Sequence, residues 1–530
     1  MPVNVVRILV TDGINEQCAQ ILRNRGLHVT VVVAKMTSEE IIRRLKTHDA
    51  LLVRSATKVT AEIIEASPGL KLIGRAGTGV DNIDVDAATR HGVLVMNTPG
   101  GNTLSAAEHT CVMIASLSRN LPAACASLKA GKWERSKFMG SEMYGKTLAV
   151  LGLGRIGREV AQRMRAFGMR VIGFDPMVSA EAAQEFHVEK RELDEIWPEA
   201  DYITVHTPLI PQTKNLINAD ALSRCKHGVR IINVARGGIV DEAALLNALK
   251  TGRCGGAGLD VFAEEPPTNL ALVQHPATIC TPHLGANTRE AQQRVARELA
   301  EQVASAAQSG TLVGLVNAPN LNDAMRFASR PWLWLSRALG TVAGMLAGVG
   351  SGKPFELQLT LNGPDMDAMQ SFLISSVLVG LMAGMTPNGV NLINAPMLAH
   401  EAGIRVSVTR DSAATPAHTI GVRITLDGQE HSVVGELQGE QSVLVQLDRA
   451  RFESGVTLGG NVLFFKSDGS GDALMPIITA LVSARAELLT VMASGPEDTT
   501  PLIAVRTLDP VHAPEKLPTS HAKFLLQTYF

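Results

Sequence analysis

Three glycines and one aspartate near the middle of the chain have the spacing of a dinucleotide-binding site. Gly152, Gly154 and Gly157 follow the apolar run TLAVL, and Asp175 follows a second apolar run, VIGF. In this pattern the first glycine permits a tight turn, the second lets the backbone approach a pyrophosphate, and the third lets a helix pack against the strand. The N–H groups at the start of that helix favour phosphate charge. An acid after the second strand can bind a ribose diol and would repel a 2′-phosphate, so the pattern predicts NAD rather than NADP. An ordinary glycine-rich turn is the alternative.

An imidazole, a carboxylate and a guanidinium further along the chain could carry out acid–base chemistry on a hydroxy acid beside that cofactor. His283 stands in TPHLG, directly after an apolar run, and an imidazole exchanges protons near neutral pH. Glu265, in AEEPP, could fix the tautomer of the imidazole and stabilise its charged form. Arg236, after IINVA, could bind a substrate carboxylate and polarise the C2 oxygen through its planar fork. The alternatives are a surface arginine, a loop glutamate and a histidine bonded to nearby backbone, and Glu264 competes with Glu265.

Positive charge near the first strands could bind a phosphate. Arg54 closes the run ALLV and Arg75 follows KLIG, so both would lie at the carboxyl edge of one sheet. Two guanidinium groups that converge there suit a phosphate. Asn102, in PGGNT, could hydrogen-bond a carboxylate from the start of a helix, and Arg135, in KWER, could add a third cation. A solvated basic turn is the alternative for Arg135.

The segments that carry these residues alternate between short apolar runs and amphipathic stretches. Over the first hundred residues VRILV, VTVVV, ALLV and KLIGR predict strands, with helices at 15–25, 38–46 and 60–66. After the glycine loop, DYITVHTPL, GVRIINVARGG, GGAGLDVFAEEPP and ATICTPHLG continue the alternation, flanked by helices expected at 103–120 and 288–308. This order is typical of two doubly wound α/β units with parallel sheets, which bind ligands at the carboxyl ends of their strands.

The pattern changes after Asn317. RVSV, GVRITL and HSVVGEL predict strands, with a hairpin at Asp427-Gly428. NVLFF, a helix at 473–484, ELLTV and LIAVRT predict a further unit. We therefore expect two small α+β domains after the doubly wound pair. The tail after Pro510 is rich in proline and gives no clear pattern.

The composition excludes several classes of partner. The 530 residues include 49 basic and 51 acidic side chains and 4% aromatics, which does not suit nucleic acid or an anionic membrane surface. The longest apolar helix expected, 372–385, is shorter than the roughly 18 residues that cross a bilayer. Six cysteines without a C-x-x-C pair, and an N-terminus that reads as a strand, suggest a cytoplasmic enzyme with reduced thiols. His109, His206 and Cys225 match no metal-ligand spacing, so we expect structural roles for them and no metal.

Several longer segments, taken in order, resemble a known family of oxidoreductases. They are GRAGTGVDNID at 74–84, VLGLGRIGREVA, VARGGIVDEAAL at 234–245, GAGLDVFAEEPP at 256–267 and TPHLGANTREAQ at 281–292. These segments are similar to the D-isomer-specific 2-hydroxyacid dehydrogenases. VNLINAPMLAHEAGI resembles the extra domain of the long members of that family, and the last unit resembles a degenerate ACT-type module. The resemblance implies NAD-dependent oxidation of 3-phosphoglycerate to 3-phosphohydroxypyruvate, the first committed step of L-serine biosynthesis.

The resemblance also implies a domain organisation. Residues 1–98 and 290–316 would form the substrate-binding domain, and residues 99–289 the NAD-binding domain. Residues 317–455 would form the intervening α+β domain, and residues 456–530 the ACT-like domain.

The family pattern assigns roles to individual residues. It gives catalysis to Arg236, Glu265 and His283, with Glu265 preferred because it directly precedes the two prolines. It also places Arg236 and His283 in contact with both the substrate and the cofactor. The further cofactor contacts that it implies are Arg155 and Ile156 at the pyrophosphate, Thr207 near the adenosine, Val234, Ala235 and Asp260 around the nicotinamide, and Thr78 and Gly285 along the cleft. A carboxylate at the position of Asp260 could orient the ring through its carboxamide. Simple turn chemistry is the alternative for Thr78 and Thr207.

The resemblance implies a homo-oligomer as well. The helix expected at 103–120 resembles the family's subunit-contact helix, so we expect a dimer or a tetramer, and Arg135 would then reach the substrate of a neighbouring subunit. An ordinary interdomain helix is the alternative.

Two other functions fit parts of the pattern. A glyoxylate or hydroxypyruvate reductase would share the core, but Arg54, Arg75 and the long C-terminal extension disfavour it. An NAD-sensing transcriptional co-repressor would also share the core. Such proteins usually carry a disordered tail, whereas this extension has apolar strand and helix patterning and should fold.

Overall fold

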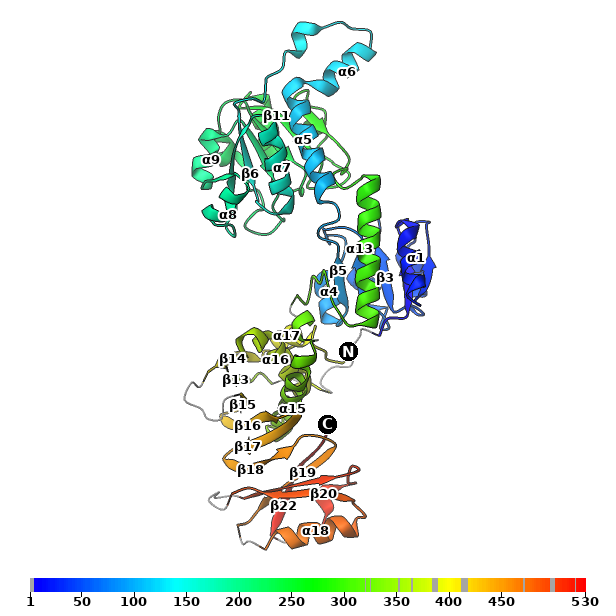
Figure 1. Cartoon of the computed structure of the whole chain (residues 1–530), viewed down its shortest axis with the longest axis vertical. Helices are drawn as coiled ribbons and strands as arrows, with labels where there is room; N and C mark the ends of the chain where they lie inside the picture. The colour runs from blue at the N-terminus through cyan, green and yellow to red at the C-terminus, as the bar shows by residue number, and fades with distance from the viewer. Residues whose placement is uncertain are drawn as a thin grey trace.

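Four sheets follow one another along the chain. The computed structural model describes residues 4–530 except 320, 325, 351–352, 364–365, 384–388, 411–417, 470–471, 496–500 and 520. The molecule is elongated, with the second sheet at one end and the fourth at the other (Figure 1). We call the parts built on the first two sheets the first and second lobes, and the parts built on the last two the third and fourth modules.

The first lobe is a five-stranded parallel sheet covered by helices on both faces. Its elements are β1 (Arg7–Val10), α1 (Glu16–Asn24), β2 (His28–Val31), α2 (Ser38–Leu45), β3 (Ala50–Val53), α3 (Ala61–Glu65), β4 (Leu72–Arg75), α4 (Val85–Arg90), β5 (Leu94–Asn97) and the returning helix α13 (Arg289–Gln308). The strand order is β2-β1-β3-β4-β5. Because successive strand side chains face opposite ways, Leu52 packs under α1 and α13 whereas Leu51 and Val53 pack under α2, α3 and α4.

The second lobe is a seven-stranded parallel sheet. Its elements are α5 (Thr103–Arg119), α6 (Leu121–Lys129), η1 (Arg135–Phe138), β6 (Thr147–Leu151), α7 (Arg155–Ala166), β7 (Arg170–Phe174), α8 (Ala180–Glu185), β8 (Glu189–Lys190), α9 (Leu193–Glu199), β9 (Tyr202–Val205), α10 (Ala219–Arg224), β10 (Val229–Asn233), α11 (Glu242–Lys250), β11 (Cys254–Leu259), α12 (Leu270–Val273) and β12 (Thr278–Cys280). The order β12-β11-β10-β9-β6-β7-β8 reverses between β6 and β9, which is where such sheets bind ligands. The predicted pair of doubly wound parallel units is confirmed.

Two long helices connect the lobes. α5 leads from the first lobe into the second, and α13 returns to pack Val295, Leu299 and Val303 against the first sheet (Figure 1). Both helices match the expected ranges, 103–120 and 288–308, to within one residue at each end. The substrate side and the cofactor side of the predicted site are therefore held together by α5 and α13.

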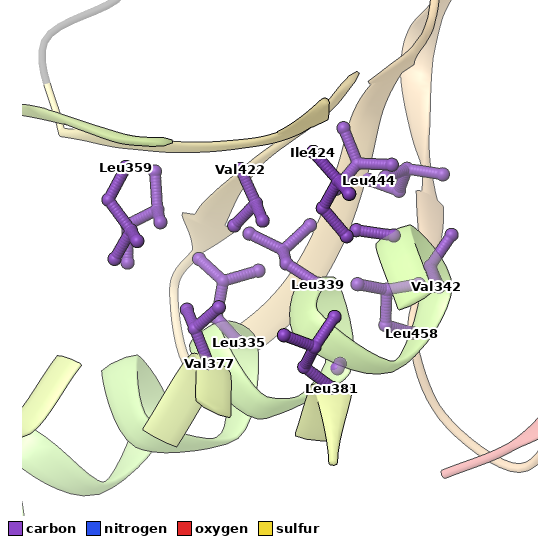
Figure 2. Packing of buried hydrophobic residues seen from close by; sticks show 14 of the residues in the cluster. Leu335, Leu339, Val342, Leu359, Val377, Leu381, Val422, Ile424, Leu444 and Leu458 are labelled. Carbon is purple, nitrogen blue, oxygen red and sulfur yellow. The ribbon is translucent and has the colours of Figure 1, made fainter. Parts of the chain in front are cut away.

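The third module is a mixed six-stranded sheet with helices on one face. Its elements are α14 (Leu321–Ala324), η2 (Phe327–Ser329), α15 (Arg330–Leu346), β13 (Glu356–Asn362), α16 (Met366–Leu381), α17 (Ala395–Glu401), β14 (Arg405–Thr409), β15 (Thr419–Leu426), β16 (Gln429–Gln438), β17 (Gln441–Leu447) and β18 (Ala450–Thr457), in the sheet order β14-β13-β15-β16-β17-β18. Figure 2 shows Leu339 of α15 and Val377 of α16 facing Val422 of the sheet. The predicted hairpin is present, because Asp427 and Gly428 both have positive φ, 52° and 79°.

The fourth module is an antiparallel four-stranded sheet with one helix. Its elements are β19 (Asn461–Ser467), α18 (Leu474–Ser483), β20 (Leu488–Ala493), β21 (Leu502–Thr507), η3 (Pro514–Lys516) and β22 (Ala522–Tyr529), in the order β20-β21-β19-β22. The sequence predicted no element after Pro510, yet β22 pairs with β19 over its whole length. That pairing joins segments far apart in the chain, so the local sequence pattern after Pro510 does not predict this strand. β18 extends to Thr457, past the boundary expected at 455.

The extension is docked onto the first lobe through polar contacts. The Arg90 guanidinium donates two hydrogen bonds to Glu401 Oε1, at 3.0 and 2.9 Å. Asn391 Nδ2 donates to the Gly92 carbonyl at 3.2 Å, and Asn394 Nδ2 donates to the Arg90 carbonyl at 3.2 Å. The segment VNLINAPMLAHEAGI, singled out in the sequence, thus includes the residues that fix the third module to the first lobe.

Within the part of the chain that the structure describes, no single helix is long and apolar enough to cross a membrane. α5 and α6 meet the length and composition test only as a pair, and they are bent by 64°. The apolar helix expected at 372–385 corresponds to α16. Positions 384 and 385 of the expected range lie outside the described residues.

We predict that Gly92→Ala loosens the contact between the extension and the first lobe. Gly92 has a φ of 69°, and a Cβ there would overlap the Asn391 side chain, so we expect a loss of about 1–3 kcal/mol in stability. Limited proteolysis should then cut between the first lobe and the third module sooner than in the parent protein. Gly131→Ala is the matched control, since Gly131 has a φ of 76° with no atom within 4 Å of the added Cβ. Equal behaviour of the two variants would contradict the docking role.

Candidate active site

The predicted site residues lie at the carboxyl ends of strands in both lobes. In the second lobe they come from the loops after β6, β7, β9, β10, β11 and β12, which carry the glycine loop, Asp175, Thr207, Arg236, Asp260 and His283. In the first lobe Arg54 directly follows β3 and Arg75 ends β4. An ion pair joins the two lobes, because Arg236 Nε donates to Asp81 Oδ2 at 2.8 Å.

The glycine loop has the geometry that close approach of a pyrophosphate requires. Gly152 has a φ of 99°, a left-handed conformation that side chains disfavour. A Cβ on Gly157 would overlap the Gly152 carbonyl oxygen, so only glycine lets α7 begin this close to β6. Gly154 has open space where a Cβ would point, and Arg155 and Ile156 open α7 directly after it. Because Gly154 has no side chain, nothing at this position covers the N–H groups at the start of α7.

The residues predicted at the adenosine end surround this loop. Asp175 Oδ2 accepts a hydrogen bond from the Leu153 amide at 2.9 Å, which ties the end of β7 to the glycine loop. Thr207 Oγ1 is buried without a hydrogen-bond partner among the described residues, as expected of a group that binds a ligand. His206, in contrast, is bonded to Thr204 Oγ1 at 3.0 Å, and burial lowers its pKa to about 4. The His206 imidazole is therefore neutral near pH 7, and its structural role stays a prediction.

His283 and Glu265 form the hydrogen-bonded pair that acid–base chemistry requires. His283 Nδ1 lies 2.8 Å from Glu265 Oε2. An ionised carboxylate only accepts, so Nδ1 carries the proton and Nε2 is left to accept one. Both side chains are partly exposed, at 46% and 39%, so a small molecule can reach them. Glu264 is bonded instead to Thr268 Oγ1 at 2.9 Å, so it does not compete for the imidazole.

Asp260 anchors the turn that presents His283. Its carboxylate is fully buried and accepts hydrogen bonds from the Leu284 and Gly285 amides at 2.7 and 2.8 Å. Its carbonyl oxygen accepts from the His283 amide at 2.9 Å, and His283 has a φ of 54°. Burial opposes ionisation of Asp260, but the hydrogen bonds from His109, Thr281 and the two amides outweigh it and lower its pKa. The predicted contact of Asp260 with a nicotinamide stays a prediction; the visible role is to hold this turn.

Arg236 is held in place by the first lobe as well as by its own loop. Besides the ion pair with Asp81, its Nη1 donates to the Ala235 carbonyl at 2.7 Å. A Cβ on Gly79 would overlap Nη2 of Arg236, so the glycine makes room for the guanidinium. Sequence reasoning missed Asp81, although its place in the segment GRAGTGVDNID marked it as an acid close to a glycine turn.

Arg54 and Arg75 converge with Arg236, as the phosphate hypothesis requires. Burial, and then the charges of Arg236 and Arg54, lower the pKa of Arg75 to about 10, which leaves it charged at neutral pH. Arg75 Nε is buried and has no hydrogen-bond partner in the part of the chain that the structure describes. Three cations that repel one another, one of them with an unused donor, form a site that an anion would stabilise.

The other predicted residues lie in three places. Thr78 Oγ1 donates to Asn102 Oδ1 at 2.7 Å, which places both beside the start of α5. Val234 and Gly285 are in contact near Asp260, since a Cβ on Gly285 would lie 2.9 Å from Val234 Cγ1. Arg135 is in η1, within the segment that projects past α6 at the far end of the second lobe (Figure 1). The structure of one chain therefore does not bring Arg135 to the other site residues.

The described residues include no group of three or more His, Cys, Asp or Glu side chains that could hold a metal ion. Cys225 is buried, its thiol donates to the Ala221 carbonyl at 3.1 Å, and burial raises its pKa to about 12. A thiol with so high a pKa is a poor nucleophile, which fits the structural role predicted for it.

Two family profiles match the chain. The one described as "D-isomer specific 2-hydroxyacid dehydrogenase, NAD binding domain" matches residues 111–285. The one described as "D-3-phosphoglycerate dehydrogenase intervening domain" matches residues 328–448. The first covers most of the second lobe and the second covers most of the third module.

Known proteins resemble the chain over more than half of its length. D-3-phosphoglycerate dehydrogenase of Rattus norvegicus is 46% identical over 93% of this chain and 93% of its own length. The enzyme of the same name from Bacillus subtilis is 42% identical, over 81% of this chain and 80% of its own length. Among solved structures, D-lactate dehydrogenase from Aquifex aeolicus complexed with NAD and lactic acid has a TM-score of 0.51 and 32% identity, over 57% of this chain and 96% of its own.

We predict that Gly154→Ala and Gly157→Ala fail in different ways. Gly154→Ala fills open space at a φ that alanine tolerates, so stability should be kept while NADH binding weakens by about tenfold or more. Gly157→Ala should destabilise the second lobe by about 1–3 kcal/mol, because its Cβ would overlap backbone. NADH fluorescence titration and thermal unfolding measure the two effects. Unchanged NADH affinity in the stable Gly154→Ala variant would contradict the pyrophosphate assignment.

Proposed function

This chain belongs to the D-3-phosphoglycerate dehydrogenases, and we propose on that basis how its residues carry out NAD-dependent oxidation of 3-phospho-D-glycerate to 3-phosphohydroxypyruvate. The observation that supports the proposal most directly is the His283–Glu265 hydrogen bond of 2.8 Å. Arg236 follows β10 in the same parallel sheet, so it lies at the same sheet edge as this pair. The pair supplies a proton acceptor, and the arginine supplies a cation for a carboxylate and a developing carbonyl.

In this proposal His283 is the general base. Glu265 accepts the Nδ1 proton and leaves Nε2 to take the proton of the substrate's C2 hydroxyl. The imidazolium that forms is stabilised by the same carboxylate. In the reverse direction His283 returns the proton to the carbonyl oxygen, so one residue serves both directions.

Arg236 binds the substrate's carboxylate and polarises its C2 oxygen. Asp81 fixes Nε and the Ala235 carbonyl fixes Nη1, so the plane of the guanidinium is set before substrate arrives. Nη2 has no hydrogen-bond partner among the described residues and is the group left to bind a carboxylate oxygen. Asn102 would add an amide donor from the start of α5.

NAD supplies the hydride acceptor when it is bound. The residues present fit it: Gly154 leaves space for a pyrophosphate, and the buried Thr207 hydroxyl lacks a partner. Asp175 stands at the end of β7, where its charge would bind the ribose diol. Val234, Ala235 and Gly285 would flank the nicotinamide, with Thr78 on the opposite wall.

Arg54 and Arg75 bind the 3-phosphate in this proposal. Their convergence with Arg236 is costly without an anion, and a phosphate dianion would offset the repulsion. The same feature disfavours the glyoxylate or hydroxypyruvate reductase alternative, whose substrates carry no phosphate. The co-repressor alternative predicted a disordered extension, whereas β13 to β22 form two folded modules.

We also propose that the protein acts as a homodimer or tetramer in the cytoplasm, with no nucleic-acid or membrane partner. α6 has no buried residue, and Leu121, Leu128, Trp133 and Met139 of the projecting segment are mostly exposed. A second copy that covered them could carry Arg135 to a neighbouring site. The six cysteines are unpaired, which fits a reducing compartment.

The division into four domains, at 1–98 with 290–316, 99–289, 317–455 and 456–530, is part of the same proposal. Each part has its own sheet, and α13 packs on the first one.

His283→Ala should abolish NAD reduction and leave NADH affinity nearly unchanged, because the imidazole takes the proton but does not hold the dinucleotide. Glu265→Gln should lower kcat by about a hundredfold, and Glu264→Gln by less than about twofold. The measurement is absorbance of NADH formed from 3-phosphoglycerate. An active alanine variant, or equal losses at the two glutamates, would remove the base assignment.

Arg75→Met should raise KM for 3-phosphoglycerate by at least about tenfold, because a hydrogen bond to a charged group is lost. Oxidation of unphosphorylated glycerate, which lacks the group that Arg75 binds, serves as the internal control and should keep its kcat/KM. If both substrates lose equally, or if the parent enzyme oxidises glycerate as well as 3-phosphoglycerate, Arg75 does not select the phosphate.

A further inference from the structure

His109 has a place in the site that its sequence context did not reveal. It lies on α5, between the lobes, and its Nε2 is 3.1 Å from Thr281 Oγ1 and 3.3 Å from Asp260 Oδ1. Its side chain is 19% exposed, so solvent screens these contacts little. Thr281 begins the turn that carries His283, and Asp260, which follows β11, accepts hydrogen bonds from that turn.

The direction of each hydrogen bond in this cluster follows from the groups present. The Thr281 hydroxyl has one proton and donates it to Asp260 Oδ1 at 2.6 Å. Toward His109, both Thr281 Oγ1 and the carboxylate therefore only accept. His109 must carry a proton on Nε2 and donate it, whether its imidazole is neutral or charged.

The Asp260 carboxylate is the hub of the cluster. It is fully buried, so its charge depends on the donors around it, which are His109, Thr281 and the Leu284 and Gly285 amides. These two amides belong to the residues directly after His283. The amide of His283 itself donates to the Asp260 carbonyl oxygen at 2.9 Å. Loss of one donor would make the ionised form of the Asp260 carboxylate less stable. The hydrogen bonds that this carboxylate accepts from the turn, which keep His283 at a φ of 54°, would then weaken.

The start of α5 also contacts the first lobe, beside the proposed substrate site. Asn102, which precedes its first residue, accepts a hydrogen bond from Thr78 at 2.7 Å. His109 is two turns further along the same helix. α5 therefore connects Asn102, the proposed carboxylate donor, with the turn of the general base.

We propose that His109 is a positioning residue for His283, which it acts on by donating a hydrogen bond to the Asp260–Thr281 pair that holds the turn. The inference rests on the proposed function, since it concerns the same site. By this inference His109, on the helix that connects the two lobes, joins the groups that orient the His283 imidazole.

The experiment compares His109→Ala with His109→Gln in the full-length enzyme. The glutamine amide keeps an N–H donor at about the same reach, whereas alanine removes it. We expect kcat for 3-phosphoglycerate to fall about tenfold or more in His109→Ala and to recover to within about threefold of the parent in His109→Gln. NADH affinity should stay within about threefold in both variants, because His109 does not contact the glycine loop. Glu108→Gln, an exposed neighbour on α5, is the control and should keep the parent kcat.

A second readout is independent of turnover. Amide hydrogen exchange at Leu284 and Gly285 should be faster in His109→Ala than in the parent and His109→Gln. Thr281→Val should show the same effect, and its combination with His109→Ala should cost less than the sum of the single changes.

The results separate the possible failures. Full kcat in a folded His109→Ala variant, or equal losses in the alanine and glutamine variants, would overturn the inference. If the parent protein failed to oxidise 3-phosphoglycerate, the proposed function would fail instead, and the exchange at Leu284 and Gly285 would still test what His109 holds.

Discussion

The site depends on one hydrogen bond, from His283 Nδ1 to the Glu265 carboxylate, because that bond decides which imidazole nitrogen is free to take a proton. The bond forms only if the imidazole is presented in one direction. His283 itself has a φ of 54°, a left-handed conformation that costs energy for a residue with a side chain. The buried Asp260 carboxylate offsets that cost, because it accepts hydrogen bonds from the Leu284 and Gly285 amides that follow. The buried carboxylate of Asp260 therefore holds the turn that presents the partly exposed imidazole of His283.

Cationic side chains from both lobes form the second part of the candidate site. Arg236 and Arg54 repel the charge of Arg75, and the carboxylates of Asp81 and Asp12 oppose that repulsion. The glycines of GRAGTGVDNID leave room for these side chains, because a Cβ on Gly77 or Gly79 would overlap a guanidinium. A bound anion would offset the repulsion between these guanidinium groups.

Sequence patterns predicted the parts of this arrangement that depend on neighbours in the chain. Strand–turn–helix order, the glycine loop and the helix ends of α5 and α13 follow from local spacing, and the preference for Glu265 over Glu264 agrees with the contacts observed. What could not be predicted joins distant segments. Asp81 reaches Arg236 from another lobe, and β22 pairs with β19 across the fourth module. His109 meets Asp260 only because α5 packs against β10, β11 and β12. Arg135 lies far from the other site residues in one chain, so its predicted role depends on a second subunit.

The most direct test of the account is a crystal structure of the enzyme with NAD and 3-phosphoglycerate bound. The account predicts the C2 hydroxyl within hydrogen-bond distance of His283 Nε2, the carboxylate on Arg236 and the phosphate on Arg54 and Arg75. A complex in which the imidazole faces away from C2, or in which the phosphate lies elsewhere, would contradict it.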